Sequence, residues 1–247
     1  MKTILTIVRK DLSRFFSQLT SVMSLVIFYI ILGLLLWYMP DIGILDGYYA
    51  GLDIYFSLVP ILLIFLLPAL NMDALSGELA AGTLDLLLIR PVSSFQIVAA
   101  KFISGLTIVF IGLLPSVVYV ITVYFLANPV GNIDMGAIVG SYLGLLLMII
   151  VFTSISLFAS AAVTVPVTAL MLAITLCAFW YWAFFLISRL PLFYGAWDYW
   201  IQYLGLDFHY KEMGQGLISF ASIVYVLSLT YIFGQMTWWR IQNIRYQ

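Results

Sequence analysis

The chain has 247 residues, of which 64% are hydrophobic and only 9% charged, and its mean hydropathy is +1.13. This composition is typical of a polytopic membrane protein and excludes an ordinary soluble domain, in which about a quarter of the residues are charged. The net charge of −1 provides no global basic field, so no nucleic-acid partner is expected.

Six apolar runs are long enough to cross a bilayer, which takes about 20 residues in a helix. They cover residues 19–39, 52–70, 102–126, 136–159, 167–187 and 217–238. The predicted fold class is therefore an all-α polytopic membrane protein, with residues 1–247 forming a single transmembrane domain.

Lysine and arginine are distributed unevenly between the two sides that six spans define. Two of them, Arg189 and Lys211, fall on the side opposite the termini. Eight fall on the side of the termini: Lys2, Arg9, Lys10, Arg14, Arg90, Lys101, Arg240 and Arg245. The positive-inside rule then predicts that both termini and the 71–101 segment are cytoplasmic.

In the first 16 residues, apolar side chains recur every three to four positions, as on one face of a helix, and basic side chains occupy positions between them. The apolar positions are Ile4, Leu5, Val8, Leu12 and Phe15. Such a helix can lie in the plane of the lipid headgroups, with its lysines and arginines reaching into water. A plain basic anchor that only sets the topology is an equally good interpretation.

Residues 71–101 form a semi-polar interruption between the second and third spans. Ser93-x-x-Gln96 is a capping-box pattern, so the third helix should begin before Lys101 and project beyond the membrane. Pro91 disfavours helical geometry at Arg90, so residues 78–89 should form a separate short helix, weakened or bent at Gly82-Thr83. The alternative is a simple connector whose charges are solvated.

Three features of the spans bear on packing. Pro60, Pro68 and Pro115 remove backbone donors and should kink the second and third spans. Glycines at spacing four allow another helix to approach closely, either within the protomer or at a dimer seam. These glycines are Gly136, Gly140 and Gly144.

Aromatic side chains gather towards the predicted outer face. In the fifth span they suit either an interfacial belt or the wall of a cavity. Residues 188–216 form the longest outer segment, which we expect to contain short helices at, or re-entering, the outer leaflet. The candidate residues for a transport pathway or outer gate are Phe179, Trp180, Trp182, Trp197 and Trp200.

Several classes of function lack their motifs in this sequence. There is no phosphate-binding loop and no dinucleotide fingerprint, and His209 is the only histidine. We therefore expect no catalytic residues, no metal site and no directly bound cofactor. The spans contain essentially no ionisable residue, which argues against ion-coupled transport. Three classes of function remain: a transporter whose energy comes from a partner outside the membrane, a scaffold, and a lipid-handling protein.

The 71–101 segment resembles the ABC-2 type exporter permeases. The resemblance rests on Glu78-x-x-x-Gly82-Thr83-Leu84-Asp85, then Arg90-Pro91-Val92-Ser93, Gln96-Ile97 and Lys101. Residues 126–136 and 140–146 are similar to the gliding-motility-associated ABC permeases of Bacteroidetes, as are residues 44–48 and 204–210. The pattern departs from the family at Leu79 and Ala80, where basic residues are usual.

The resemblance implies a permease subunit in the bacterial inner membrane that pairs with an identical or related permease. The 71–101 segment would be the coupling segment that docks on a separate ABC ATPase, which would bind ATP and magnesium. Its implied coupling residues are Glu78, Gly82, Thr83, Asp85, Arg90, Pro91 and Lys101. An accessory gliding-motility subunit is a further expected partner. The alternative is a non-transporting scaffold or anchor for a motility or secretion machine.

Overall fold

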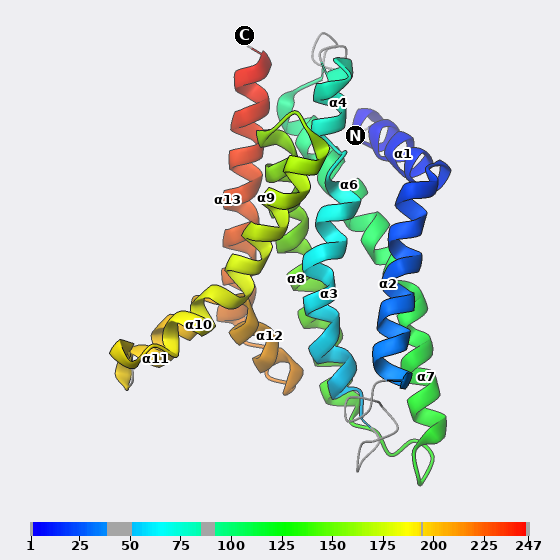
Figure 1. The fold of residues 1–247 in the computed structure, drawn as a ribbon, viewed down its shortest axis with the longest axis vertical. Coiled ribbons are helices and arrows are strands. Elements are labelled where there is room, and N and C mark those ends of the chain that lie inside the picture. The colour runs from blue at the N-terminus through cyan, green and yellow to red at the C-terminus, as the bar shows by residue number, and fades with distance from the viewer. Residues whose placement is uncertain (1, 39–50, 85–91, 194, 246–247) are drawn as a thin grey trace.

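A computed structural model describes residues 2–38, 51–84, 92–193 and 195–245, and within these ranges the ordered elements are all helical (Figure 1). The α-helices are α1 (Lys2–Ser17), α2 (Leu19–Tyr38), α3 (Asp53–Asn71), α4 (Ser76–Ala80), α6 (Ser94–Leu113), α7 (Val117–Leu126), α8 (Met135–Ala162), α9 (Pro166–Ala178), α10 (Phe184–Ser188), α11 (Ala196–Gln202), α12 (Leu206–Gly214) and α13 (Phe220–Arg245). Short 3₁₀ turns lie at Leu114–Ser116 and Pro191–Phe193, and a π-helical turn lies at Phe179–Ala183.

Among the described residues, six helical stretches are long and apolar enough to cross a membrane, which confirms the predicted fold class. They are Ser21–Tyr38, Asp53–Ala80, Ser94–Leu126, Met135–Ala162, Pro166–Ser188 and Phe220–Arg245. The helices extend beyond several of the apolar runs, because polar residues at their ends continue or cap the helical backbone. The capping box predicted at Ser93 and Gln96 is present, so α6 begins at Ser94.

The helix α8 is the centre of the bundle and contacts α3, α6, α9, α12 and α13. Its sequence is apolar on every face, which is the pattern of a helix surrounded by other helices. Side chains such as Phe152 and Ile155 are completely buried there. Cys177 of α9 lies in the same core as a free, buried thiol.

The prolines act differently in the two spans that contain them. Pro115 lies in the 3₁₀ turn that separates α6 from α7, so the third span is broken at this residue as predicted. Pro60 and Pro68 both lie inside α3, which the structure describes as one helix from Asp53 to Asn71.

The glycines of α8 let α12 approach its backbone. A Cβ atom at Gly140 would lie 2.2 Å from the carbonyl oxygen of Met213, and one at Gly144 would lie 2.9 Å from the ring of Tyr210. Both neighbours belong to α12 of the same chain. At Gly136 the nearest atom is the side-chain oxygen of Asp134, at 3.3 Å.

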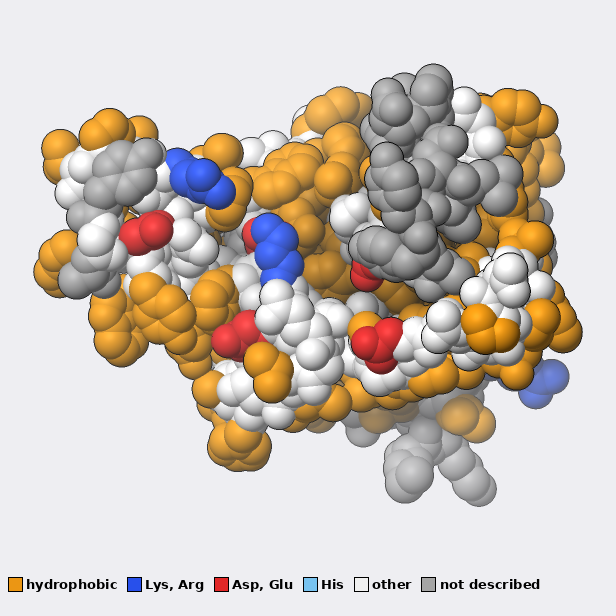
Figure 2. Space-filling view, turned by 90° about the horizontal axis from the view of Figure 1, so that it is seen from below, with side chains coloured by type: hydrophobic (Ala, Val, Ile, Leu, Met, Phe, Trp, Pro, Cys, Tyr) orange, Lys and Arg blue, Asp and Glu red, His pale blue; other side chains and the backbone are white. Residues whose placement is uncertain are grey.

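The end of the molecule opposite the termini combines a charged centre with apolar margins (Figure 2). Acidic and basic side chains gather in the middle of this face, whereas hydrophobic side chains cover most of its edge. The helices α10, α11 and α12 lie towards this end, and both termini lie at the other (Figure 1).

Candidate functional site

The short helix α4 lies at the end of the bundle that carries both termini, between the end of α3 and the beginning of α6 (Figure 1). The chain turns between Met72 and Leu75, and α4 then covers five residues. Leu75 and Leu84 flank α4 and pack into a small apolar cluster with Ile7 of α1, Ile97 of α6 and Ile241 of α13. This cluster fixes α4 against α1, α6 and α13.

Ser160, near the end of α8, satisfies the backbone of the turn that precedes α4. Its hydroxyl accepts hydrogen bonds from the backbone N–H groups of Leu75 and Ser76, both at 3.0 Å. The same hydroxyl donates to the carbonyl oxygen of Met72 at 2.8 Å. Ser160 is completely buried, so water could not replace these bonds without entering the core.

Replacing Ser160 with alanine is expected to lower the free energy of unfolding by about 1–3 kcal/mol, since it leaves buried backbone groups unpaired. The matched control is Ser154→Ala, because Ser154 is also buried on α8 but bonds only to Val151 of its own helix. Thermal unfolding in detergent measures both variants. Equal losses of stability in the two would contradict the role given to Ser160.

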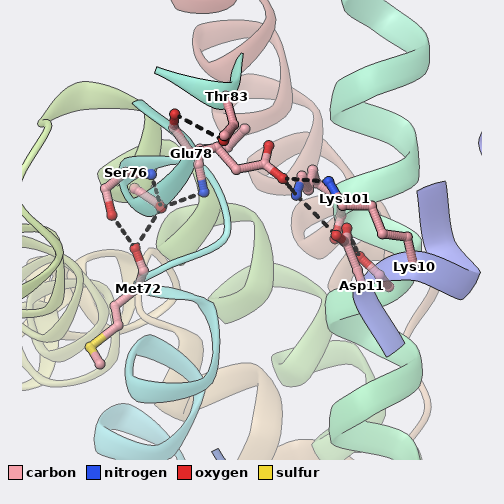
Figure 3. A network of polar contacts seen from close by, with 10 residues as sticks. Lys10, Asp11, Met72, Ser76, Glu78, Thr83 and Lys101 are labelled. Atoms are coloured by element: carbon pink, nitrogen blue, oxygen red, sulfur yellow. Dashed lines mark hydrogen bonds and ion pairs between the residues drawn. The ribbon is translucent and has the colours of Figure 1, made fainter. Parts of the chain in front are cut away.

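A cluster of charged side chains joins α4 to α1 and α6 (Figure 3). Lys101 Nζ lies 2.8 Å from Glu78 Oε1 and 3.1 Å from Asp11 Oδ1. Lys10 Nζ adds a second contact to Glu78 Oε1 at 3.3 Å, and Ser104 Oγ lies 3.3 Å from Asp11 Oδ2. The coupling cluster, as we call Lys10, Asp11, Glu78, Lys101 and Ser104, contains two cations and two carboxylates.

Burial makes the central pair of this cluster energetically important. The side chains of Glu78 and Lys101 are each only 2% exposed, whereas that of Lys10 is 54% exposed. Charges removed from water need close partners, and each of these two has one. Glu78 Oε2 is buried without a hydrogen-bond partner among the described residues, so a single carboxylate oxygen carries all the contacts.

The sequence of the chain also matches a known protein family. A model of the ABC-2 family transporter proteins matches residues 5–190, which is most of the chain. This chain belongs to the ABC-2 transporter family. It is therefore a multi-pass transmembrane permease subunit of an ABC transporter, and membership implies an ABC ATPase partner and a dimeric arrangement. A comparison with curated proteins found no match.

The coupling cluster changes the role we expect for Glu78 in this ABC-2 protein. The resemblance implied that Glu78 is a coupling residue, and in the structure its carboxylate is buried and paired with Lys101 and Lys10 of its own chain. Lys101, another predicted coupling residue, is buried beside it. In this structure both residues hold α4 in place and do not present their charges at the surface.

The helix predicted over residues 78–89 is interrupted within the described part. The helix α4 begins at Ser76 and ends at Ala80, and Gly82 has a positive φ of 65°, a left-handed conformation that glycine adopts without strain. The hydroxyl of Thr83 donates to the carbonyl oxygen of Glu78 at 3.3 Å. Asp85, Arg90 and Pro91 lie outside the described residues, as do residues 44–48.

Four members of the site were not predicted from the sequence: Lys10, Asp11, Ser104 and Ser160. Asp11 is the only acidic residue among the first 40, and this isolation in a basic segment was the available signal. Ser160 had no comparable signal, because its partners lie 84 to 88 positions earlier in the chain.

The aromatic residues predicted for a pathway or gate are spread over two environments. Phe179, Trp180 and Trp182 lie in the π-helical turn of the fifth span, where Trp180 packs against Phe233 of α13 at 6.3 Å between ring centroids. Trp197 and Trp200 are exposed on α11. The two groups thus lie on separate elements, the fifth span and α11.

His209 is buried where α12 meets α13. Its Nε2 lies 2.9 Å from the carbonyl oxygen of Tyr203, and its Nδ1 lies 2.8 Å from the hydroxyl of Ser222. A carbonyl only accepts, so Nε2 donates and Nδ1 accepts from Ser222 in the neutral ring. Burial lowers the pKa of His209. The described residues contain no group of histidine, cysteine and acidic side chains that could hold a metal ion.

Proposed function

We propose that this ABC-2 permease is the membrane subunit of an exporter in the bacterial inner membrane, with both termini and α4 in the cytoplasm. The excess of lysine and arginine at the end that carries the termini supports this orientation. The energy would come from the hydrolysis of ATP, which a separate ATPase would bind together with magnesium, because the sequence of this chain lacks a phosphate-binding loop.

The coupling cluster is the observation that carries the proposal. Glu78 lies in α4, Lys101 lies in α6 of the third span, and Asp11 and Lys10 lie in α1. A force that the ATPase applies near α4 would therefore reach α1 and α6 together. The helices α3 and α6 would transmit the movement towards the opposite face, where the aromatic residues of the fifth span and α11 would form the outer gate.

The similarity of residues 126–136 to gliding-motility permeases favours cargo that serves gliding or cell-surface secretion, with an accessory motility subunit as a further partner. The second permease would be an identical or a related chain. The alternative is a scaffold that binds an ATPase without transporting anything, and ATP turnover separates the two.

The test is Glu78→Gln, measured as the ratio of ATP hydrolysis by the ATPase with and without the permease in proteoliposomes. We expect this ratio to fall about tenfold towards unity, the size of effect that losing one charged hydrogen bond produces, while the ATPase still co-purifies. Asp53→Asn is the control, because Asp53 is exposed at the other end of α3.

An unchanged ratio in a folded Glu78→Gln complex would contradict the role of the coupling cluster. A ratio of one for the wild-type permease would contradict transport and support the scaffold.

A further inference from the structure

A polar pocket lies beside the coupling cluster, at the corner where α1 meets α2 and where α3 ends. Arg14, Gln18, Ser21, Asn71 and Asp73 line it, and Lys101 and Ser104 of the cluster border it. Asn71 is buried, and its amide nitrogen donates to the carbonyl oxygen of Leu67 at 2.9 Å. Such a group of polar side chains is unusual in a chain that is 64% hydrophobic.

Two residues of this pocket carry opposite charges that the protein itself does not neutralise. Within the described ranges, neither Arg14 nor Asp73 takes part in an ion pair, and they do not pair with one another. Lys101 and Asp11, by contrast, are already paired. Besides the paired Asp11 and Lys101, the pocket therefore presents one further cation, Arg14, and one further carboxylate, Asp73, which lie farther apart than an ion pair.

The surroundings of the pocket place it at the membrane surface. On other faces of α1 and α2, outside the pocket, the side chains of Phe16, Leu19 and Met23 are large, apolar and exposed, as expected of residues that face lipid. The helix α1 carries basic residues and leads directly into the first span at α2. The pocket thus lies at the level where the headgroups of one leaflet meet the protein.

We propose that this pocket binds the phosphoethanolamine headgroup of a phospholipid. The phosphate would pair with the guanidinium of Arg14, which suits phosphate geometry. The primary ammonium would donate to the carboxylate of Asp73, and Gln18 and Ser21 would supply further hydrogen bonds. The acyl chains would extend from the pocket into the bilayer.

The chemistry of the pocket discriminates against the other common phospholipids. Asp73 repels a purely anionic headgroup, because no cation among the described residues forms an ion pair with it. A choline headgroup has a positive charge but no N–H group, so it cannot donate to Asp73. The pocket shares Asp11, Lys101 and Ser104 with the coupling cluster, but the lipid preference depends on Arg14 and Asp73, which lie outside that cluster.

The test measures phospholipid binding to the full chain, delipidated in detergent, by native mass spectrometry. We expect phosphatidylethanolamine to bind about tenfold more tightly than phosphatidylcholine or phosphatidylglycerol, the size of one charged hydrogen bond. Asp73→Asn should abolish the preference over phosphatidylglycerol. Arg14→Gln should weaken binding about tenfold, and Arg14→Lys should restore part of it.

Arg240→Gln is the control, because Arg240 is an exposed arginine on α13, away from the pocket. Soluble glycerophosphoethanolamine, added as a competitor, shows whether the pocket binds a lipid or a free phosphoethanolamine compound. Weak competition by it supports the lipid, and competition at the concentration of the lipid itself overturns the proposal. Equal binding of the three phospholipids to the wild-type chain, or equal effects of Arg240→Gln and Arg14→Gln, would also overturn it.

Discussion

Replacing Lys101 with methionine is expected to lower the free energy of unfolding by about 3–5 kcal/mol, the usual cost of leaving a buried charge without its partner. Methionine is similar in length to lysine, so the change removes the charge and keeps most of the packing. Glu78 would retain only Lys10, whose side chain is 54% exposed, and Asp11 would lose its close cation. Chemical unfolding in mixed micelles measures the difference.

The matched control is Lys211→Met, because Lys211 also pairs with a carboxylate, that of Asp207, at 2.7 Å. This lysine is 60% exposed, so its loss should cost at most about 1 kcal/mol. The double variant Lys101→Met with Glu78→Gln should recover part of the stability, because it removes one of the stranded charges. Similar losses in the two lysine variants would contradict the burial argument.

Replacing Gly140 with alanine is expected to destabilise the contact between α8 and α12 by about 1–3 kcal/mol. The added Cβ atom would lie 2.2 Å from a backbone oxygen of Met213, so α12 must move, and no side-chain rotation can relieve the overlap. Protease accessibility or hydrogen exchange of residues 206–214 should increase. Thermal unfolding reports the loss of stability.

Gly234→Ala separates this overlap from the general effect of placing alanine in a helix. Gly234 lies within α13, and no atom lies within 4 Å of the position its Cβ atom would take. Alanine there should be neutral or stabilise the helix by about 1 kcal/mol. Loss of stability at Gly234 equal to that at Gly140 would mean that the close approach of α12 is not the cause.

The spans and their local boundaries could be predicted because the information lies in neighbouring residues. Bilayer thickness requires a run of about 20 apolar residues, and six such runs are visible in the sequence. The start of α6 depends only on Ser93 and Gln96, which are three positions apart. The break at Pro115 follows from its own missing N–H group.

The coupling cluster could not be predicted in the same way, because its members are distant in sequence. Lys101 lies 23 positions from Glu78 and 90 positions from Asp11. The motif indicated that Glu78 was important but not where its carboxylate points. The local sequence is the same whether the side chain of Glu78 is exposed or is buried and paired. Only the packing of α1 against α6 distinguishes the two cases.

The length of the helix α8 connects contacts at the two ends of the protein. Its 28 residues form one continuous helix of about 42 Å. Ser160 near one end holds the turn that precedes α4, and Gly140 near the other end lies against α12. A tilt of this helix must shift both contacts at once. Movements at the end that carries both termini and at the opposite end are thus linked through this one helix, whichever helices line the path of the cargo.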